Sequence, residues 1–326
     1  ITNATQASPC VLTVTPVSTA VSVTAINSAV SASYAPSDTV SLAGGTFTTR
    51  AVLTVIETLL SSVAINNNGS GYQPNEDIVL AGGSQIVAPV VNIDTTKVVS
   101  ASINSAGAGG TPGAQVLTGT TGTGTKWQAN VTVGGGGTVT SINSIAVAGA
   151  YTANPNYGPT GPLTDKMSGG GFPSEAASPV FNVAMGVNTI SITNPGLFVA
   201  NAPGGNFTQA STEGSGIGAT FVSGLFGIAA AVITVAGSYT VLPANPVAQF
   251  STSGTGVGAT FNVTWSTPPA LATGDWFFVA DVGGMTPLNN RTFVGAVAGA
   301  SISLFDVYGA PIDSSAYPAY TTGGTA

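Results

Sequence analysis

Charge is scarce in this sequence, and histidine is absent. Only 5% of the 326 residues are charged, whereas about 25% are charged in an average soluble domain. The chain has twelve acidic residues and only five basic ones, which are scattered at Arg50, Lys97, Lys126, Lys166 and Arg291. A net charge of −7 without a basic cluster excludes the usual electrostatic interface for nucleic acid. The lack of histidine removes the commonest general base and metal ligand of proteins.

Cysteine and long apolar runs are also nearly missing. Cys10 is alone, so no disulfide can form within the chain, and we expect its thiol to be a small buried hydrophobic group. A membrane-spanning helix needs about 18 or more apolar residues in a row. The longest candidate, Gly224–Gly237, is shorter than that and is interrupted by Thr234. The sequence therefore predicts no membrane insertion.

Glycine and β-branched residues are abundant. Glycine accounts for 44 of the 326 residues, about double its usual share of ~7%. Val, Thr, Ile and Ser are frequent, while the charged helix formers Glu, Lys and Arg are rare. Hydrophobic residues make up 43%, which excludes the composition of a disordered chain. The composition therefore predicts an all-β fold with a surface of Thr, Ser, Asn and backbone polar groups.

The sequence repeats itself at intervals of about forty residues. The tetrapeptide Ala25–Ser28 recurs three times, so that its isoleucine stands at Ile26, Ile65, Ile103 and Ile142, and degenerate copies follow at Ile190/Ile192 and Ile233. The octapeptide Gly214–Phe221 matches Gly254–Phe261 at an offset of 40 residues. These copies predict six units, near residues 24–62, 63–100, 101–140, 141–189, 190–230 and 231–265.

An aromatic residue follows the repeated isoleucine in five of the six units. The five are Tyr34, Tyr72, Tyr151, Phe198 and Tyr239, and the unit around Gly109-Gly110 has none. We expect them to be buried anchors in equivalent places; aromatic binding residues are the alternative. Each unit is predicted to hold three or four short strands, in the second unit Ser62–Asn66, Asp77–Leu80 and Val87–Ile93, with turns at 67–71 and 82–83. Such short strands bury a core only by packing on neighbouring units.

No motif predicts catalysis, a cofactor or a metal. Gly124-Thr125-Lys126-Trp127 lacks the Ser or Thr that follows Lys in a phosphate-binding loop. Gly214–Gly218 lacks the dinucleotide-binding spacing and recurs forty residues later, as a structural turn would. No spacing singles out two of the twelve carboxylates as a glycosidase pair, although such a pair stays open. The proline-rich stretch Ala153–Ser178 is predicted to be an irregular inserted loop that carries contacts.

The last sixty residues carry a different series of motifs. Gly274–Val279, Gly284–Val294 and Tyr317–Thr325 follow each other in order. Together they resemble the small β-barrel module known as the FCCH domain in ubiquitin-activating enzymes and widespread in virion proteins of tailed bacteriophages. The residues that carry the resemblance are Asp275, Met285, Leu288, Asn289, Arg291, Phe293, Tyr320, Gly323 and Gly324. Asn290 replaces the glycine usual before the arginine.

The first strand of that module is found at the other end of the chain, in Ile1–Val14. The resemblance covers residues 1–16 and 266–326, so it implies one barrel assembled from both ends with the repeats inserted in it. We then expect Val11, Leu12 and Val14 to pair with or pack on the strands around Trp276–Val279 and Phe293–Val297. The repeats would leave near residue 16 and return near residue 265, with their tip near the proline-rich loop. The alternative is a string of units with the chain ends far apart.

The repeats resemble the glycine-rich β-repeats of phage fibre and appendage proteins. Both resemblances imply a non-enzymatic structural protein of a tailed phage particle, located in the virion as a tail- or head-attached appendage. Its partners would be further copies of itself, as a trimer or ring, tail or capsid proteins, and a glycan or receptor on the host surface. The alternatives are a capsid decoration protein, a secreted bacterial adhesin and a tailspike depolymerase. No ubiquitin chemistry is expected, because the chain has no adenylation domain.

Overall fold

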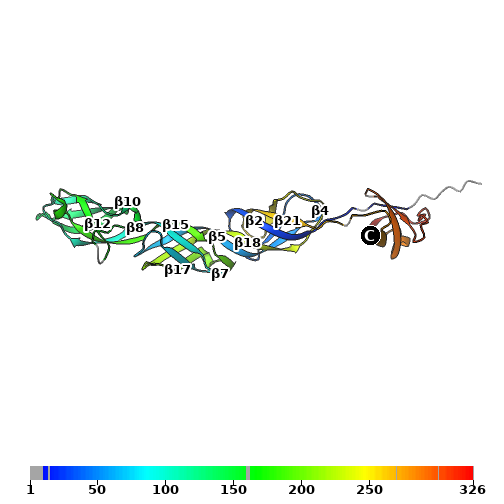
Figure 1. Ribbon diagram of the computed structural model, residues 1–326, viewed down its shortest axis with the longest axis horizontal. Helices are drawn as coiled ribbons and strands as arrows, with labels where there is room; N and C mark the ends of the chain where they lie inside the picture. The colour runs from blue at the N-terminus through cyan, green and yellow to red at the C-terminus, as the bar shows by residue number, and fades with distance from the viewer. Residues whose placement is uncertain (1–9, 14, 159–161, 269, 300, 326) are drawn as a thin grey trace, which may run out of the picture.

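The computed structural model describes residues 10–13, 15–158, 162–268, 270–299 and 301–325. The prediction of an all-β fold is confirmed, because strands make up 61% of the chain and helices 3%. The molecule is long and narrow (Figure 1), with the C-terminal strands at one end and the green middle of the chain at the other. A large curled antiparallel sheet forms most of this length.

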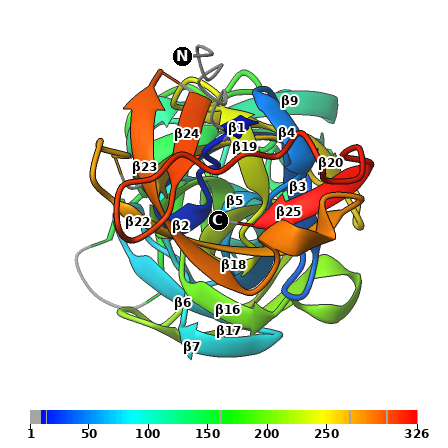
Figure 2. The same ribbon diagram turned by 90° about the vertical axis from the view of Figure 1, so that its right-hand side faces the viewer.

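The five strands at one end form what we call the terminal sheet. Its order is β1 (Val11–Thr13), β24 (Ser301–Phe305), β23 (Arg291–Ala298), β22 (Trp276–Gly283) and β25 (Thr322–Thr325), with the 3₁₀ turn η3 (Thr286–Leu288) after β22. In the end-on view these strands stand in front of the rest of the molecule (Figure 2). Glycine and proline turns separate them, and buried and exposed residues alternate along β22 and β23, as in a sheet with one solvated face.

The rest of the chain, which we call the arm, contains three hydrophobic clusters in series. The proximal cluster lies among β2 (Ala20–Ala32), β3 (Thr39–Leu42), β4 (Thr46–Thr49), β19 (Ser238–Val241), β20 (Val247–Thr252) and β21 (Val257–Trp265). The middle cluster lies among β6 (Asp77–Ala81), β7 (Ser84–Val87), β16 (Leu197–Ala200), η2 (Pro203–Gly205) and β17 (Asn206–Thr212). The distal cluster lies among β9 (Gly113–Gly119), β10 (Thr123–Thr125), β11 (Gln128–Val133), β12 (Val139–Val147), β13 (Ala150–Ala153), β14 (Thr164–Gly169) and η1 (Glu175–Ala177).

Four long strands join these clusters. β5 (Val52–Ser70) pairs with β18 (Ile217–Val235), and β8 (Val90–Ser105) pairs with β15 (Val180–Asn194). Along β5, Leu53 and Val55 belong to the proximal cluster and Leu60 to the middle one. Because the same continuous ladder of hydrogen bonds serves two clusters, neighbouring segments of the arm share backbone as well as side-chain contacts.

These strands correct the prediction of short strands. The predicted strand Ser62–Asn66 and the turn at 67–71 are largely one strand, since β5 runs on to Ser70. The predicted strand Val87–Ile93 is divided, because Val87 ends β7 and Val90 begins β8, which runs on to Ser105. All five predicted unit boundaries, at 62/63, 100/101, 140/141, 189/190 and 230/231, lie inside strands. The glycine at 69 has the positive φ of a turn residue, 57°, but its neighbours Asn68 and Ser70 pair with Ala219 and Ile217 of β18 in one register, so the strand continues past it.

The stretch Ala153–Ser178 is also more regular than predicted. It contains β14, which pairs with both β15 and β9. It contains η1 as well, where the Ser174 side chain accepts a hydrogen bond from the Ala177 N–H. The prediction of an irregular loop is therefore wrong for these two elements; residues 159–161 lie outside the described part of the chain.

The N-terminal strand β1 lies in the C-terminal sheet. Val11 pairs with Ser303 and Leu12 with Ile302, both on β24, and the Cys10 N–H donates to the Ile312 carbonyl at 2.7 Å. The partner strand is β24 rather than the β22 and β23 strands predicted, and Val14 lies outside the described residues. Cys10 is buried, at 5% exposure. The alternative with the chain ends far apart does not agree with this pairing.

The segment that leaves the terminal sheet and the segment that returns to it lie side by side. Ala20 pairs with Trp265, the first and last paired positions of β2 and β21. Just before this pair, the Thr19 N–H donates to the Ser266 Oγ at 2.8 Å, and the Ser266 N–H donates to the Thr19 carbonyl at the same distance. The arm therefore begins and ends at one place, and Figure 1 shows the two connecting segments there as thin traces.

Candidate functional site

The five aromatic residues singled out in the sequence are all buried, with exposures of 0–1%. Tyr34 and Tyr239 lie in the proximal cluster, Tyr72 and Phe198 in the middle one, and Tyr151 in the distal one. The arm thus places two of these residues in each of its first two clusters and one in the third. They are not brought together into a single site.

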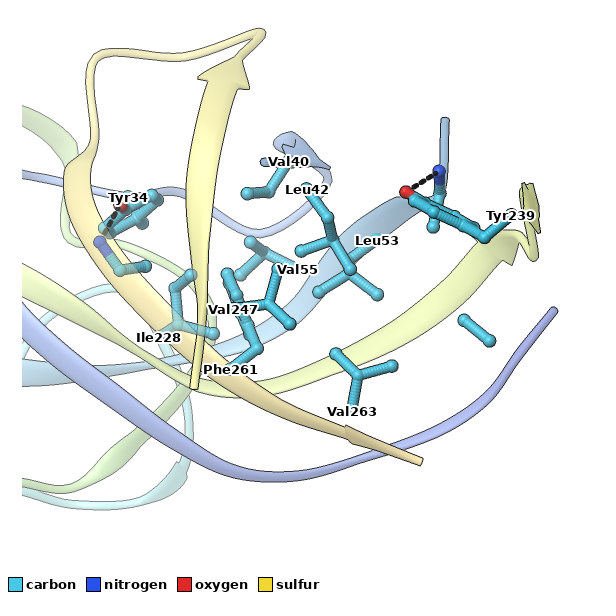
Figure 3. Packing of buried hydrophobic residues seen from close by; sticks show 13 residues of the cluster. Tyr34, Val40, Leu42, Leu53, Val55, Ile228, Tyr239, Val247, Phe261 and Val263 are labelled. Carbon is cyan, nitrogen blue, oxygen red and sulfur yellow. Dashed lines mark hydrogen bonds between the residues drawn. The ribbon is translucent and has the colours of Figure 1, made fainter. Parts of the chain in front are cut away.

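The four tyrosine hydroxyls perform the same task. Each one accepts a hydrogen bond from a backbone N–H that would otherwise be buried without a partner, and Figure 3 shows two of these bonds at the two ends of the proximal cluster. The donors are Ala259 to Tyr34 at 3.1 Å, Ala219 to Tyr72 at 3.0 Å, Trp127 to Tyr151 at 2.9 Å and Ala51 to Tyr239 at 3.0 Å. A phenolic ring fills the core and its hydroxyl satisfies the backbone, which explains the choice of tyrosine.

Two of these tyrosines are also held by glutamine and glycine. The Tyr72 hydroxyl donates to Gln209 Oε1, and the Gln209 Nε2 donates to the Gly216 carbonyl at 2.7 Å. A Cβ atom on Gly216 would overlap the Tyr72 ring. Tyr34, Gln249 and Gly256 repeat this arrangement. The glycine of the repeated motif is therefore required because a side chain there would occupy the space of the tyrosine ring.

Replacing Gly216 with alanine should destabilise the middle segment by about 1–3 kcal/mol, because the added methyl group forces the Tyr72 ring out of place. The matched control is Gly135→Ala, since no atom lies within 4 Å of a Cβ built there. Chemical denaturation followed by amide exchange of β5 and β18 measures the effect. Equal stability of the two variants would contradict this role of Gly216.

Alkaline pH should weaken the arm. Burial raises the pKa of Tyr151 from 10.0 to about 12. The hydrogen bond from Trp127 lowers this pKa, and the charge of Asp165 raises it further. Burial also raises the pKa values of Tyr34 and Tyr72. The unfolded chain therefore loses these protons first, so stability is full below pH 10 and falls as pH rises toward 12. In denaturation midpoints measured across this range, Tyr151→Phe should reduce the slope. An unchanged slope would contradict the prediction.

The unit without a repeat aromatic has a substitute. Gly110 occupies the corresponding position and is buried, and a Cβ atom built there would lie 2.6 Å from the Phe172 ring. Phe172 comes from the stretch before η1 and packs against the distal cluster. The long stretch 153–178 thus supplies the aromatic that the third unit lacks, which sequence comparison of the units alone could not show.

No sequence motif predicted the polar clasps, each of three hydrogen-bonded residues, at the two junctions of the arm. Between the proximal and middle clusters, the fully buried Thr58 hydroxyl donates to Asn201 Oδ1, and Asn201 Nδ2 donates to the Tyr34 carbonyl at 2.7 Å. Between the middle and distal clusters, Thr96, Asn154 and Tyr72 make the same three-residue clasp. The signal was an asparagine three residues after the aromatic, which occurs at Asn75, Asn154 and Asn201, and the last two of these form the clasps.

Asn154→Ala should loosen the junction between the middle and distal clusters, because it leaves the Thr96 hydroxyl and the Tyr72 carbonyl without their partner. We expect a loss of about 1–3 kcal/mol in local stability. A wider spread of arm shapes in small-angle scattering should accompany it. Asn143→Ala, on the exposed surface of β12, is the control, and an effect as large there would contradict the clasp.

The signature residues near the C-terminus hold the terminal sheet together. Leu288 and Phe293 are buried, and Met285 packs on the same cluster. Asn289 bonds both backbone groups of Val282, accepting from its N–H at 2.7 Å and donating to its carbonyl at 2.9 Å. These contacts are structural, and none presents a reactive group.

The remaining signature residues lie at turns and edges. Asp275 accepts from the Ala272 N–H at 2.8 Å, and Arg291 Nη1 donates to the Pro287 carbonyl at 3.3 Å. Tyr320 is exposed, and Gly323 and Gly324 belong to β25. Asn290, which stands where glycine was expected, has a φ of 56°. Asparagine tolerates this left-handed conformation, which explains the exchange.

The far end of the arm is a glycine-rich tip. Three loops meet there through backbone hydrogen bonds, from the Ala108 N–H to Ala177 at 2.9 Å, from Gly110 to Gly137 at 2.8 Å and from Thr111 to Gly170 at 2.8 Å. Nearby, Lys166 Nζ lies 3.3 Å from Glu175 and 3.1 Å from the Tyr157 hydroxyl. The hydrogen bond with Tyr157 is the main cause that raises the pKa of Lys166.

Asp165 is the one fully buried carboxylate in the described part of the chain. Its Oδ1 accepts from the Thr121 N–H at 2.9 Å, the Thr121 hydroxyl at 2.7 Å and the Thr120 N–H at 3.2 Å. Its Oδ2 accepts from the Trp127 indole N–H at 2.8 Å. Four donors offset the loss of hydration, so Asp165 organises the distal cluster.

A shallow, open hollow lies beside the proximal cluster. Its volume is about 440 Å³, and it is lined by residues 43–46, 241–244, 247 and 248. None of these residues has an ionisable side chain, so the hollow offers no group that could transfer a proton. Among the described residues, no group of three or more Cys, Asp or Glu side chains is placed to hold a metal ion.

Comparison with protein-family models, with curated proteins and with solved structures finds no match to this chain. No helix within the described residues is long and apolar enough to cross a membrane.

Proposed function

We propose that this chain is a non-enzymatic structural component of a tailed bacteriophage particle. In this proposal the terminal sheet is a small FCCH-like barrel that forms the base, and the arm is an array of six β-repeats that projects from it. The protein would be a tail- or head-attached appendage, with tail or capsid proteins and further copies of itself as partners. Its tip would face outward, toward the host surface.

The observation that carries the proposal is the pairing of β1 with β24. Residues 1–16 and 266–326 are the two stretches that resemble the phage module, and this pairing joins Val11–Thr13 of the first to strands of the second in one sheet, although the whole arm separates them in sequence. An insertion of this kind is tolerated when its own ends lie together, and Ala20 and Trp265 are paired where the arm begins. A base holding both described ends and a tip at the far end suit attachment and projection.

The competing classes require features of other kinds. A depolymerase needs two carboxylates facing each other across a cleft, and the hollow beside the proximal cluster has none. A capsid decoration protein shares the attachment expected here and differs in its place on the particle. A secreted adhesin would be found on the bacterial surface and not in phage particles.

Mass spectrometry of purified phage particles tests the proposal. Because the chain has five Lys and Arg but 24 aromatic residues (13 Phe, 8 Tyr and 3 Trp), chymotrypsin gives better coverage than trypsin. We expect peptides from the terminal sheet and the arm at a constant ratio to the major capsid protein through density-gradient purification. Recovery of the protein only from bacterial surface or secreted fractions would overturn the proposal.

A further inference from the structure

The outer surface of the terminal sheet is unusually apolar. Along β22, Phe277 and Val279 point into the core, at 6% and 1% exposure. The alternate residues Trp276 and Phe278 therefore point outward, and they are 66% and 55% exposed. In a sheet with one solvated face these positions are ordinarily polar.

Strand pairing extends this apolar surface across the sheet. Trp276 stands directly opposite Val294 on β23, and Val294 stands opposite Phe305 on β24. Directly paired residues lie on the same face. Val11 on β1 is 58% exposed and pairs with Ser303, two residues before Phe305. We call these five residues, Val11, Trp276, Phe278, Val294 and Phe305, the outer face.

The size of the outer face suits the centre of a protein interface. Each aromatic side chain can bury about 150–250 Å², so the outer face offers a few hundred of the roughly 800 Å² that a standard interface buries on each partner. Exposed tryptophan and phenylalanine side chains are enriched at the centres of interfaces, where they supply most of the binding energy. The remaining area must come from a polar rim.

The rim of the outer face is acidic. Asp275 precedes Trp276 and Asp306 follows Phe305, which places them on opposite sides of the Trp276–Val294–Phe305 row. Both side chains are half-buried, and their carboxylates accept backbone N–H groups in the adjoining turns, Asp275 from Ala272 and Asp306 from Tyr308 and Ala310. Residues 266–326 contain four aspartates and one arginine. The guanidinium of Arg291 lies 5.0 Å from the centre of the Phe293 ring. A second copy of this sheet would therefore bring carboxylates against carboxylates, which disfavours self-association through this face.

We propose that the outer face is a docking surface for a different protein, whose matching patch is apolar at its centre and carries Lys or Arg at its rim. The apolar centre supplies affinity, and the acidic rim selects a basic partner. This inference adds to the proposed function the chemistry of the partner that binds the base. It rests on the proposed function only for the claim that this partner belongs to a phage particle.

Binding of two designed probes to the full chain tests this inference. The probes are fluorescent helical peptides with the same leucine stripe, flanked by lysine in one and by glutamate in the other, and anisotropy gives their affinities. We expect the lysine probe to bind at least about tenfold more tightly. The double variant Trp276→Ser/Phe278→Ser should weaken it by at least about tenfold while every charge stays in place. Asp275→Asn/Asp306→Asn should bring the two probes close to equal affinity.

Phe250→Ser is the matched control, because Phe250 is an arm residue that is 63% exposed. Its affinity for the lysine probe should equal that of the wild type. The inference is overturned if both probes bind equally to the wild type, if Phe250→Ser weakens binding as much as the double variant, or if the double variant binds normally. It is also overturned if sedimentation shows a wild-type dimer that the double variant dissociates, since the occupant is then a second copy.

The assay uses no phage particle, so its outcome is separate from that of the proposed function. Absence of the chain from particles would refute the phage role and leave a measured docking surface. Presence in particles without selective probe binding would refute the docking surface alone. Amide exchange of β22 to β24 checks that each variant keeps its fold. This is expected for the serine variants because Trp276, Phe278 and Phe250 are exposed, and for Asp275→Asn/Asp306→Asn because the amide oxygen can still accept the backbone N–H groups that these side chains bind.

Discussion

Replacing Asp165 with alanine should unfold the distal segment of the arm while the terminal sheet stays folded. The buried Trp127 indole N–H would lose its acceptor, and so would the N–H and the hydroxyl of the half-buried Thr121, whereas the Thr120 N–H keeps the Lys166 carbonyl at 2.9 Å. Each unsatisfied buried donor costs about 1–3 kcal/mol, so we expect a total on the order of 3–5 kcal/mol after partial rehydration. Asp165→Asn should fall between this variant and the wild type, because it keeps one acceptor.

Amide exchange with mass spectrometry separates local from general effects. Protection should be lost in β9 to β14 and retained in β22 to β24. Asp94→Ala is the control, because that carboxylate is exposed and accepts one hydrogen bond, from Ser191 at 2.9 Å. If Asp165→Ala behaved like Asp94→Ala, the buried carboxylate would not be the organising group of the distal cluster.

Tyr72→Ala should cause a loss of similar size in the middle segment. The substitution removes a fully buried ring, for which a cost of about 3–5 kcal/mol is usual. It also leaves the Ala219 N–H and the Gln209 Oε1 without the Tyr72 hydroxyl as partner. Because Asn154 in the next segment binds the Tyr72 carbonyl, displacement of residue 72 should also reduce protection at that junction.

A graded series makes this prediction specific. Tyr72→Phe keeps the ring and loses only the hydroxyl, so it should cost about 1–2 kcal/mol. Tyr308→Ala changes a side chain that is 93% exposed, and it should be close to neutral. Stability should therefore decrease in the order Tyr308→Ala, Tyr72→Phe, Tyr72→Ala, as measured by chemical denaturation with amide exchange of β5 and β18. Any other order would contradict the role of Tyr72 as an anchor.

The all-β class could be predicted because residues that favour strands and turns are frequent along the whole sequence, so the fold class does not depend on knowing which segments pair. Strand lengths could not be predicted in the same way. The glycine at 69 resembles a turn residue when only its neighbours in sequence are considered. It lies in a strand because β18, about 150 residues away in the sequence, pairs with Asn68 and Ser70 on either side of it. Local patterns do not contain that partner.

The polar groups of the arm were the hardest part to predict. A lone acidic residue such as Asp165 ordinarily lies in solvent, and only the fold brings Thr121 and Trp127 around it. The clasps of Asn154 and Asn201 had a sequence signal in their shared spacing from Tyr151 and Phe198, but their partners Thr96 and Thr58 belong to other units. The motifs predicted the strand that carries Trp276 and Phe278. They could not predict that these side chains are exposed, because this depends on which side of the sheet the core covers.

Gold labelling of particles tests the proposed attachment and projection most directly. Gly135→Cys places a thiol in the open β11–β12 turn, and Tyr308→Cys places one beside the terminal sheet. The native Cys10 is buried and should stay unlabelled, which the wild type checks. By electron microscopy of phage particles, we expect gold at residue 135 to lie farther from the particle surface than gold at residue 308. Gold at residue 135 against the particle, with residue 308 outermost, would contradict attachment through the base.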